Sequence, residues 1–402
     1  MGDDSVARYD LSGEAWQASI DGSQDVLQGP GYLYRPGHVL VAAGQGYTDG
    51  IVSRLHGLGA VPHEEFTAHF SDEGLAIHAF EVPAEHHLPS LIDQLRGHEP
   101  GQPEPFVAPN HVFTGQYYYQ GGPEGGPHAI RADDESQVPH PSAGPARIAF
   151  LDTGYDEAVK YLHPALYERL EHDGAEEPVL RDGLLAHEAG HGTFIAGIIM
   201  KHSPALHIRQ VKVLNRAGVT DDVTIARGLL RAGSAPVINL SLGGYTHGRQ
   251  PPMALAAALG QLHDSVAVVA AAGNNGSQDP FWPAAFTRVV AVGALDTTRG
   301  EPARAGFSDY GNWVDIYAPG TDVHGPYLHG TYSEPGRHLA HLKGWARWSG
   351  TSFAAPQVAA EIAGRVTDTV TARQAAIELV ESARRVPGIG AVLIPQGSQA
   401  WG

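Results

Sequence analysis

The sequence contains no cysteine among its 402 residues. Disulfides, thiol nucleophiles and zinc sites built from thiolates are therefore excluded. Basic residues are also scarce, because 26 Lys and Arg face 44 Asp and Glu and give a formal net charge of −18. A nucleic-acid interface needs clustered Lys and Arg, so this balance predicts no nucleic-acid partner.

Long apolar runs are missing as well. No stretch approaches the ~18 consecutive apolar residues that would span a membrane, which predicts no membrane partner. The first residues, MGDDSVARYDLSGEAW, lack the basic and apolar segments of a secretory signal. If Met1 is the native start, we expect a cytoplasmic protein.

Apolar residues make up 42% of the chain and charged residues only 17%, which is enough apolar material for a sizeable core. The length favours two domains. Shifts in composition divide the chain into an extension, a small α+β domain, a linker rich in Gly and Pro, and an α/β domain. These parts cover residues 1–34, 35–119, 120–145 and 146–402.

The small domain shows the order strand, helix, strand, strand, helix, strand. The predicted strands cover 38–43, part of 60–70, 75–82 and 106–113, and the predicted helices cover 49–58 and 88–95. This order is typical of the split βαβ unit of ferredoxin-like domains.

From Ala146 onward, short apolar strands alternate with helices. The predicted strands cover 147–151, 208–214, 237–240, 266–271 and 289–292, and the helices lie near 192–202, 221–232, 252–263, 352–366 and 372–385. Continuous β-branched runs are typical of buried parallel strands. The pattern predicts a doubly wound, mostly parallel sheet whose functional loops follow the carboxyl ends of the strands.

Three short motifs place polar side chains at the ends of these elements. DTG at Asp152 ends the first strand, HGT at His191 opens a helix, and GTSFAAP around Ser352 opens another. A serine hydroxyl becomes a nucleophile when a base lies within hydrogen-bond reach and a carboxylate orients that base. One Asp, one His and one Ser supply this set, in the chain order of subtilisin.

With these motifs, the sequence resembles the subtilase family of serine proteases over about residues 146–400. NLSLGG and AAAGNNG lie between the motifs in the expected order. The resemblance implies a subtilisin-like fold and a serine endopeptidase that acts on peptides or proteins through an acyl-enzyme, without an essential cofactor. It implies Ser352 as nucleophile, His191 as general base and acid, Asp152 as the orienting carboxylate and Asn274 as an oxyanion-hole donor. Many secreted relatives have a longer loop after the His191 helix that helps bind calcium. The short stretch Lys201–Leu206 predicts that this calcium site is missing, so no metal is expected.

The resemblance also implies substrate-binding residues. The segment that pairs with an extended substrate would consist of Ser241, Leu242, Gly243 and Gly244. Asn275 and Phe281 would border the primary pocket, where Phe281 would leave room for a small or modest apolar side chain. Asp221 and Asp222 either favour a basic substrate residue upstream of the scissile bond or form a solvated helix start.

In this family, the domain before the catalytic part is commonly a propeptide that acts as chaperone and inhibitor. Residues 35–119 would then be an intramolecular partner, with the tail Pro109–Gln120 in the cleft. A separate substrate-recruiting module fits the same segment. The aromatic segment Thr321–Ser349 is expected to form a rim beside the leaving-group side of the cleft, or a plain surface hairpin.

Other functions remain open. His187–His191 matches the H-E-x-x-H signature of zinc hydrolases, which needs both histidines on one helical face. Gly190 and Gly192 oppose such a helix. A catalytically silent peptide-binding module is the non-enzyme alternative. Within the protease hypothesis, general intracellular degradation competes with a dedicated protease that trims leader peptides from precursors.

Overall fold

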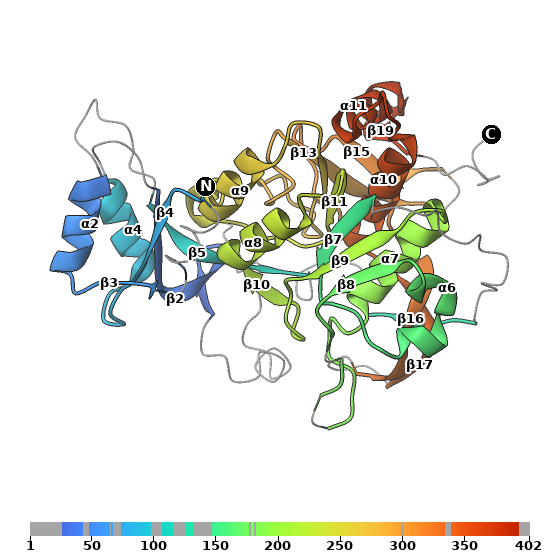
Figure 1. The fold of residues 1–402 in the computed structure, drawn as a ribbon, viewed down its shortest axis with the longest axis horizontal. Helices are drawn as coiled ribbons and strands as arrows, with labels where there is room; N and C mark the ends of the chain where they lie inside the picture. Colours follow the sequence, from blue (N-terminus) through green and yellow to red (C-terminus); the bar gives the residue numbers. More distant parts are fainter. Residues whose placement is uncertain are drawn as a thin grey trace.

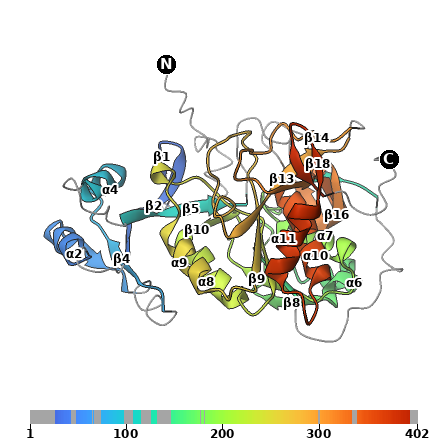
Figure 2. The same cartoon turned by 90° about the horizontal axis from the view of Figure 1, so that it is seen from above.

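The computed structural model describes residues 26–42, 48–64, 66, 74–97, 107–115, 126–131, 147–176, 178–180, 182–298, 301–333 and 339–393. Within these ranges the strands form three sheets, which Figure 1 and Figure 2 show from two sides. None of the helices in the described part has both the length and the apolar character required to cross a membrane.

The first sheet belongs to the N-terminal part of the chain. Its strands are β1 (Leu27–Gly29), β2 (Tyr32–Ala42), β3 (Val61–Pro62), β4 (Ile77–Glu81) and β5 (Val107–Thr114), and its helices are α2 (Thr48–Gly57) and α4 (Leu88–Arg96). The antiparallel order β5-β2-β4-β3 confirms the predicted split βαβ arrangement. Because β2 begins at Tyr32, this sheet crosses the boundary that we expected between residues 34 and 35.

The second sheet forms the α/β part. Its strands are β7 (Ile148–Asp152), β8 (Leu170–Asp173), β9 (Ile208–Lys212), β11 (Val237–Leu240), β12 (Ala267–Ala271), β13 (Val289–Asp296), β14 (Ala303–Arg304), β15 (Ile316–Pro319), β18 (Arg384–Val386) and β19 (Gly390–Val392). The order is β18-β19-β15-β13-β12-β11-β7-β9-β8, and the pairs from β19 to β8 are parallel. The predicted doubly wound, mostly parallel sheet is confirmed.

Helices cover both faces of this sheet (Figure 1). One face packs against α7 (His191–His202), α10 (Thr351–Arg365) and α11 (Ala372–Ser382), and the other against α8 (Asp222–Ala232) and α9 (Met253–Gln261). The shorter helices are α5 (Val159–Leu162), α6 (Pro164–Tyr167) and η1 (His247–Arg249). Strand β7 lies between β9 and β11, so the chain reverses direction around it. In such sheets, ligands bind at the carboxyl ends of the strands at this reversal.

The two parts share a hydrophobic core. Along β2, Val39 and Val41 face the helices α2 and α4, whereas Leu40 faces α8 and α9, as the two-residue period of a strand requires. Figure 1 shows the N-terminal sheet between these two helix pairs. Strand β10 (Val219–Asp221) of the α/β part also pairs with β5 and extends the N-terminal sheet.

Two acidic residues at this junction hold helix ends. Asp221 accepts a hydrogen bond from the Thr224 amide at the start of α8 and forms a 3.1 Å ion pair with Arg35. The Asp222 carboxylate is fully buried and accepts hydrogen bonds from the amides of Ala254 and Leu255 at the start of α9. Asp221 therefore lies at a helix start as expected, but that start is buried and not solvated, and both carboxylates are already engaged within the protein.

The third sheet contains the predicted aromatic insertion. It consists of β16 (Val323–Tyr332), β17 (Ala340–Trp348) and β6 (His128–Ala129), the last of which comes from the predicted linker. Pro326 packs so closely on Gly197 of α7 that a Cβ atom there would overlap the proline ring. Tyr327 and Trp348 are buried against α7 and its neighbours. The segment is therefore no plain surface hairpin, and Trp348 lies edge-on to the His191 ring with 5.5 Å between the centroids. The rim beside the leaving-group side stays a prediction.

Candidate active site

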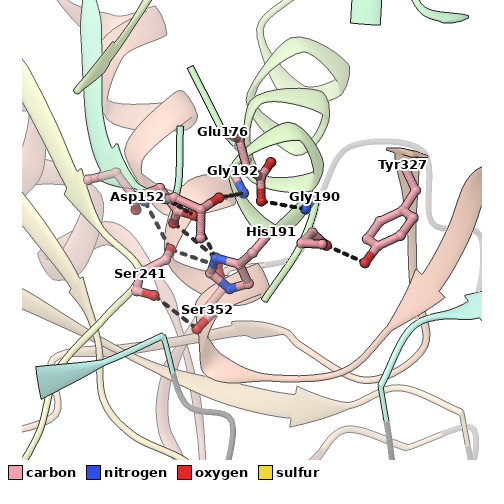
Figure 3. Close-up of polar contacts among 11 residues, drawn as sticks. Asp152, Glu176, Gly190, His191, Gly192, Ser241, Tyr327 and Ser352 are labelled. Atoms are coloured by element: carbon pink, nitrogen blue, oxygen red, sulfur yellow. Dashed lines mark hydrogen bonds and ion pairs between the residues drawn. The ribbon is translucent and has the colours of Figure 1, made fainter. Parts of the chain in front are cut away.

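The three polar motifs meet at the reversal point of the parallel sheet, where His191 lies between Asp152 and Ser352 (Figure 3). Asp152 is the last residue of β7 and is fully buried. Its two carboxylate oxygens lie 2.8 and 2.9 Å from His191 Nδ1. The Thr153 amide donates a further hydrogen bond of 2.8 Å to this carboxylate. The predicted pair of carboxylate and imidazole is therefore formed.

Helix α7 begins at His191 because Gly190 takes a left-handed conformation with φ of 74°. A Cβ atom at Gly190 would lie 2.9 Å from both Tyr327 and Leu328, so larger residues do not fit. The Gly190 amide donates a hydrogen bond of 2.9 Å to Glu176 Oε1, and the Tyr327 hydroxyl donates one to the Ala189 carbonyl (Figure 3). These contacts fix the position of the imidazole.

Ser352 lies in the first turn of α10 and contacts the end of β11. Its Oγ donates a hydrogen bond of 3.3 Å to the Ser241 carbonyl, and Ser241 Oγ donates one of 2.8 Å to the Ser352 carbonyl. His191 Nε2 is buried and has no hydrogen-bond partner among the described residues. Hydrogen bonds between a nucleophile and its base often tighten only when substrate binds.

The acids around His191 favour its protonated form. Burial lowers the pKa of His191, but the charge and hydrogen bond of Asp152, with Glu188 and Glu176 nearby, outweigh this effect and raise it above the ordinary value. Burial raises the pKa of Glu188 to about 7 and that of Glu176 to about 8. An imidazolium formed during a reaction would therefore be stabilised here.

Asn274 is oriented by the residue before Ser352. Its Oδ1 accepts hydrogen bonds of 2.8 Å from both the amide and the hydroxyl of Thr351. With the oxygen engaged in this way, the amide nitrogen is the end of the side chain that can donate to a ligand. The backbone amide of Ser352 is a second donor, because the first amides of a helix lack partners within the helix.

The end of β5 pairs with the segment Ser241–Gly244, which was predicted to bind substrate. Thr114 and Gly243 exchange two backbone hydrogen bonds of 3.0 Å, and the Gly115 amide donates one of 2.9 Å to the Gly218 carbonyl. The chain at Thr114–Gly115 is therefore the middle strand of a short antiparallel arrangement. Of the other expected residues, Leu242 is buried and Gly244 pairs with Trp282 instead.

Phe281 lies under the two backbone segments that border the predicted primary pocket. A Cβ atom at Gly243 would overlap its ring, and one at Gly273 would lie 2.9 Å from it. The backbone amide of Asn275 donates a hydrogen bond of 2.8 Å to Asp309 Oδ1. The buried ring occupies space beneath the pocket, so a preference for small side chains stays a prediction with a physical basis.

The zinc alternative does not fit this geometry. Helix α7 starts at His191, so His187 lies outside it and the two histidines do not share a helical face. His187 Nδ1 lies 3.5 Å from the Tyr332 hydroxyl instead. Within the described ranges, no group of three or more potential metal ligands is found. The H-E-x-x-H match included Glu188 as the general base of a zinc hydrolase, a role that this geometry does not support.

Two other buried acids were not predicted. Glu176 holds the Gly190 turn, and Asp309 accepts hydrogen bonds from the Tyr245 hydroxyl and the amides of Asn275 and Ser277. No local motif marks either residue, because their partners lie far away in the sequence.

Comparisons with known proteins agree with this arrangement. The model of the subtilase family matches residues 146–397. A thermophilic serine proteinase from Bacillus sp. (strain AK1) is 33% identical over 71% of this chain and 69% of its own length. Thermitase from Thermoactinomyces vulgaris is 33% identical over 58% of this chain and 78% of its own.

A solved structure shows the same fold over a longer range. The crystal structure of fervidolysin from Fervidobacterium pennivorans, a keratinolytic enzyme related to subtilisin, matches with a TM-score of 0.59 and 19% identity. The match covers 92% of this chain and 63% of that one. The family match and these relatives show a subtilisin-like serine endopeptidase. The chain belongs to the subtilase family.

Proposed function

We propose that this endopeptidase works through Asp152, His191 and Ser352 and forms an acyl-enzyme on Ser352. The observation that carries the proposal is the buried contact of 2.8 Å between His191 Nδ1 and Asp152, with Ser352 at the adjoining helix start. A carboxylate on Nδ1 leaves Nε2 as the basic nitrogen that faces the substrate side.

The proposed reaction has two stages. The Ser352 hydroxyl transfers its proton to His191 Nε2 while Oγ attacks the carbonyl carbon of the scissile bond. The Asn274 amide and the Ser352 backbone amide donate to the oxyanion that forms. His191 then gives the proton to the leaving amine, and a water activated by the same imidazole releases the acyl group. Asp152 stabilises the imidazolium throughout.

The groove between Gly243 and Gly218 holds the end of β5, and we assign the N-terminal part of the chain as its first substrate. Thr114 and Gly243 are antiparallel partners, so the residue two places after Thr114 falls opposite Ser241. Ser241 contacts Ser352 through both its hydroxyl and its carbonyl. A peptide in this register has its scissile carbonyl two residues beyond the Thr114 position. In this chain that residue is Gln116, which lies outside the described residues.

We therefore expect the chain to cut itself between Gln116 and Tyr117. Intact mass spectrometry of the purified protein over time would show two products with these termini, because a peptide that keeps the register of Thr114 has its scissile bond two residues further on. A Ser352→Ala chain should remain whole under the same conditions. An uncut wild-type chain, a cut at another bond or cutting in the Ser352→Ala chain would contradict the proposal.

We further propose a dedicated role in trimming precursor peptides instead of general degradation. It is supported by the buried Phe281 ring, which packs against Gly243 in the segment that pairs with a peptide and would restrict the side chains that fit there. A cytoplasmic location goes with this role and stays a prediction from the sequence.

A further inference from the structure

Glu188 lies beneath the groove, at the residue position that follows Thr114. A Cβ atom built on Gly115 would lie 2.9 Å from Glu188 Oε2, 3.2 Å from its carboxyl carbon and 3.3 Å from Leu214 Cδ1. Real Cβ atoms essentially never approach other heavy atoms as closely as 2.9 Å. A side chain at this position would therefore point at the Glu188 carboxyl group and at Leu214, and there is no room for its Cβ atom.

The Glu188 side chain is held from the other side as well. Gly218 has φ of 70°, and a Cβ atom there would overlap Glu188 Cγ, so the stem rests directly on the Gly218 backbone. Glu188 is only 2% exposed. The Glu188 side chain thus lies between two backbone segments, with its stem on Gly218 and its carboxyl group at Gly115.

One oxygen of the carboxyl group also lacks a partner. Glu188 Oε2 is buried and forms no hydrogen bond with any described residue. A buried polar atom without a partner is costly, so an acid in this place calls for a functional explanation. The protonated or charged oxygen faces the groove, where it would meet the substrate directly.

We propose that Glu188 determines specificity by restricting the second residue before the scissile bond to glycine. This inference rests on the proposed function, because the register counts from the bond presented to Ser352. A larger residue at that position would have to displace the carboxyl group, whose stem already rests against the Gly218 backbone. The substrate class consists of peptides with glycine as the second residue before the scissile bond, as Gly115 is in a chain that is cut after Gln116.

The test uses two peptide substrates that differ only in Gly or Ala at this position. The protein is first allowed to cut itself, and the N-terminal product, whose Thr114 and Gly115 pair with the groove, is washed away. A fluorophosphonate probe then titrates the free active sites so that rates refer to them. We expect wild type to prefer the Gly peptide in kcat/KM by about 10–200-fold, the range for one methyl group in a tight pocket. Glu188→Ala should reduce the preference to less than about threefold, because the Cβ atom then has room.

Two further variants separate shape from other effects. Glu188→Gln keeps the shape of the side chain, so the preference for Gly should remain. Glu176→Gln is the matched control, because Glu176 is an equally buried acid beside His191 that contacts Gly190 and not Gly115. Its overall rate would change, but the ratio of the two peptides should not. If Glu188→Ala does not fold, the wild-type ratio and Glu188→Asp, one methylene shorter, still test the proposal.

The outcomes distinguish this inference from the proposed function. A wild-type protein that reacts with the probe at Ser352 and cleaves both peptides equally would overturn the role of Glu188 alone. A preference for the Gly peptide that persists in Glu188→Ala would also overturn the role of Glu188 alone. A protein that neither reacts with the probe nor cleaves either peptide would overturn both proposals. A preference lost in Glu188→Ala and kept in Glu176→Gln would support the assignment.

Discussion

Replacing His191 by alanine is expected to lower kcat by on the order of 10⁶-fold. In subtilisin, removal of either the nucleophilic serine or the histidine has an effect of this size. The physical reason is that the base, its orienting carboxylate and the nucleophile act as one unit. His191 Nδ1 is held by Asp152 at 2.8 Å, so removing the imidazole leaves Ser352 without a base. Steady-state kinetics on a peptide ester would measure the loss.

The double variant His191→Ala with Ser352→Ala sharpens this prediction. Since each single change already disables the unit, the double variant should be no slower than either single one. A residual rate above that in water should persist, because Asn274 and the amide at the start of α10 still bind the oxyanion. Losses that multiply in the double variant would show that the two residues act independently, against the proposed mechanism.

Removal of the N-terminal part is expected to have the second large effect. A chain that begins at residue 126 should fail to reach an active state, because β10 loses its partner β5 and α8 and α9 lose their apolar cover. Leu40, Ile77 and Phe113 belong to the same core cluster as these helices. Their burial contributes roughly 1.5–3 kcal/mol per large side chain.

The measurement is recovery of esterase activity after refolding with and without a separate peptide of residues 26–115. The peptide is removed before the assay, because its Thr114 and Gly115 pair with the groove. Activity should return only with the added peptide. A peptide with Phe113→Ala should be much less effective, whereas Val61→Ala, at a position with 55% exposure, should work as well as the unchanged peptide. Full recovery by the shorter chain alone would show that the shared core is dispensable.

Much of this fold follows from local signals in the sequence. Runs such as VINL and VAVVAA predict buried strands because β-branched side chains suit a sheet covered on both faces. β11 spans Val237–Leu240 as predicted, and α11 begins with the capping box of Thr371 and Gln374. The three motifs carry Asp152, His191 and Ser352 because each lies at an element end that the pattern of strands and helices defines.

Other features depend on contacts between distant segments, which local patterns do not encode. The pairing of β10 with β5 joins residues about a hundred positions apart. Asp222 was expected near an outer pocket or at a helix start, and its carboxylate actually holds the start of α9, more than thirty residues away. Glu188 matched a zinc signature, whereas its contacts with Gly115 and Gly218 emerge only after folding.

The central claim is that Ser352 is an activated nucleophile. Intact mass spectrometry before and after treatment with a fluorophosphonate probe tests it most directly, with peptide mapping of the adduct and Ser352→Ala as control. The account predicts a gain of one probe mass, located on Ser352 and absent in Ser352→Ala. Labelling that persists in Ser352→Ala, or a wild-type protein that cleaves peptides without reacting with the probe, would contradict it.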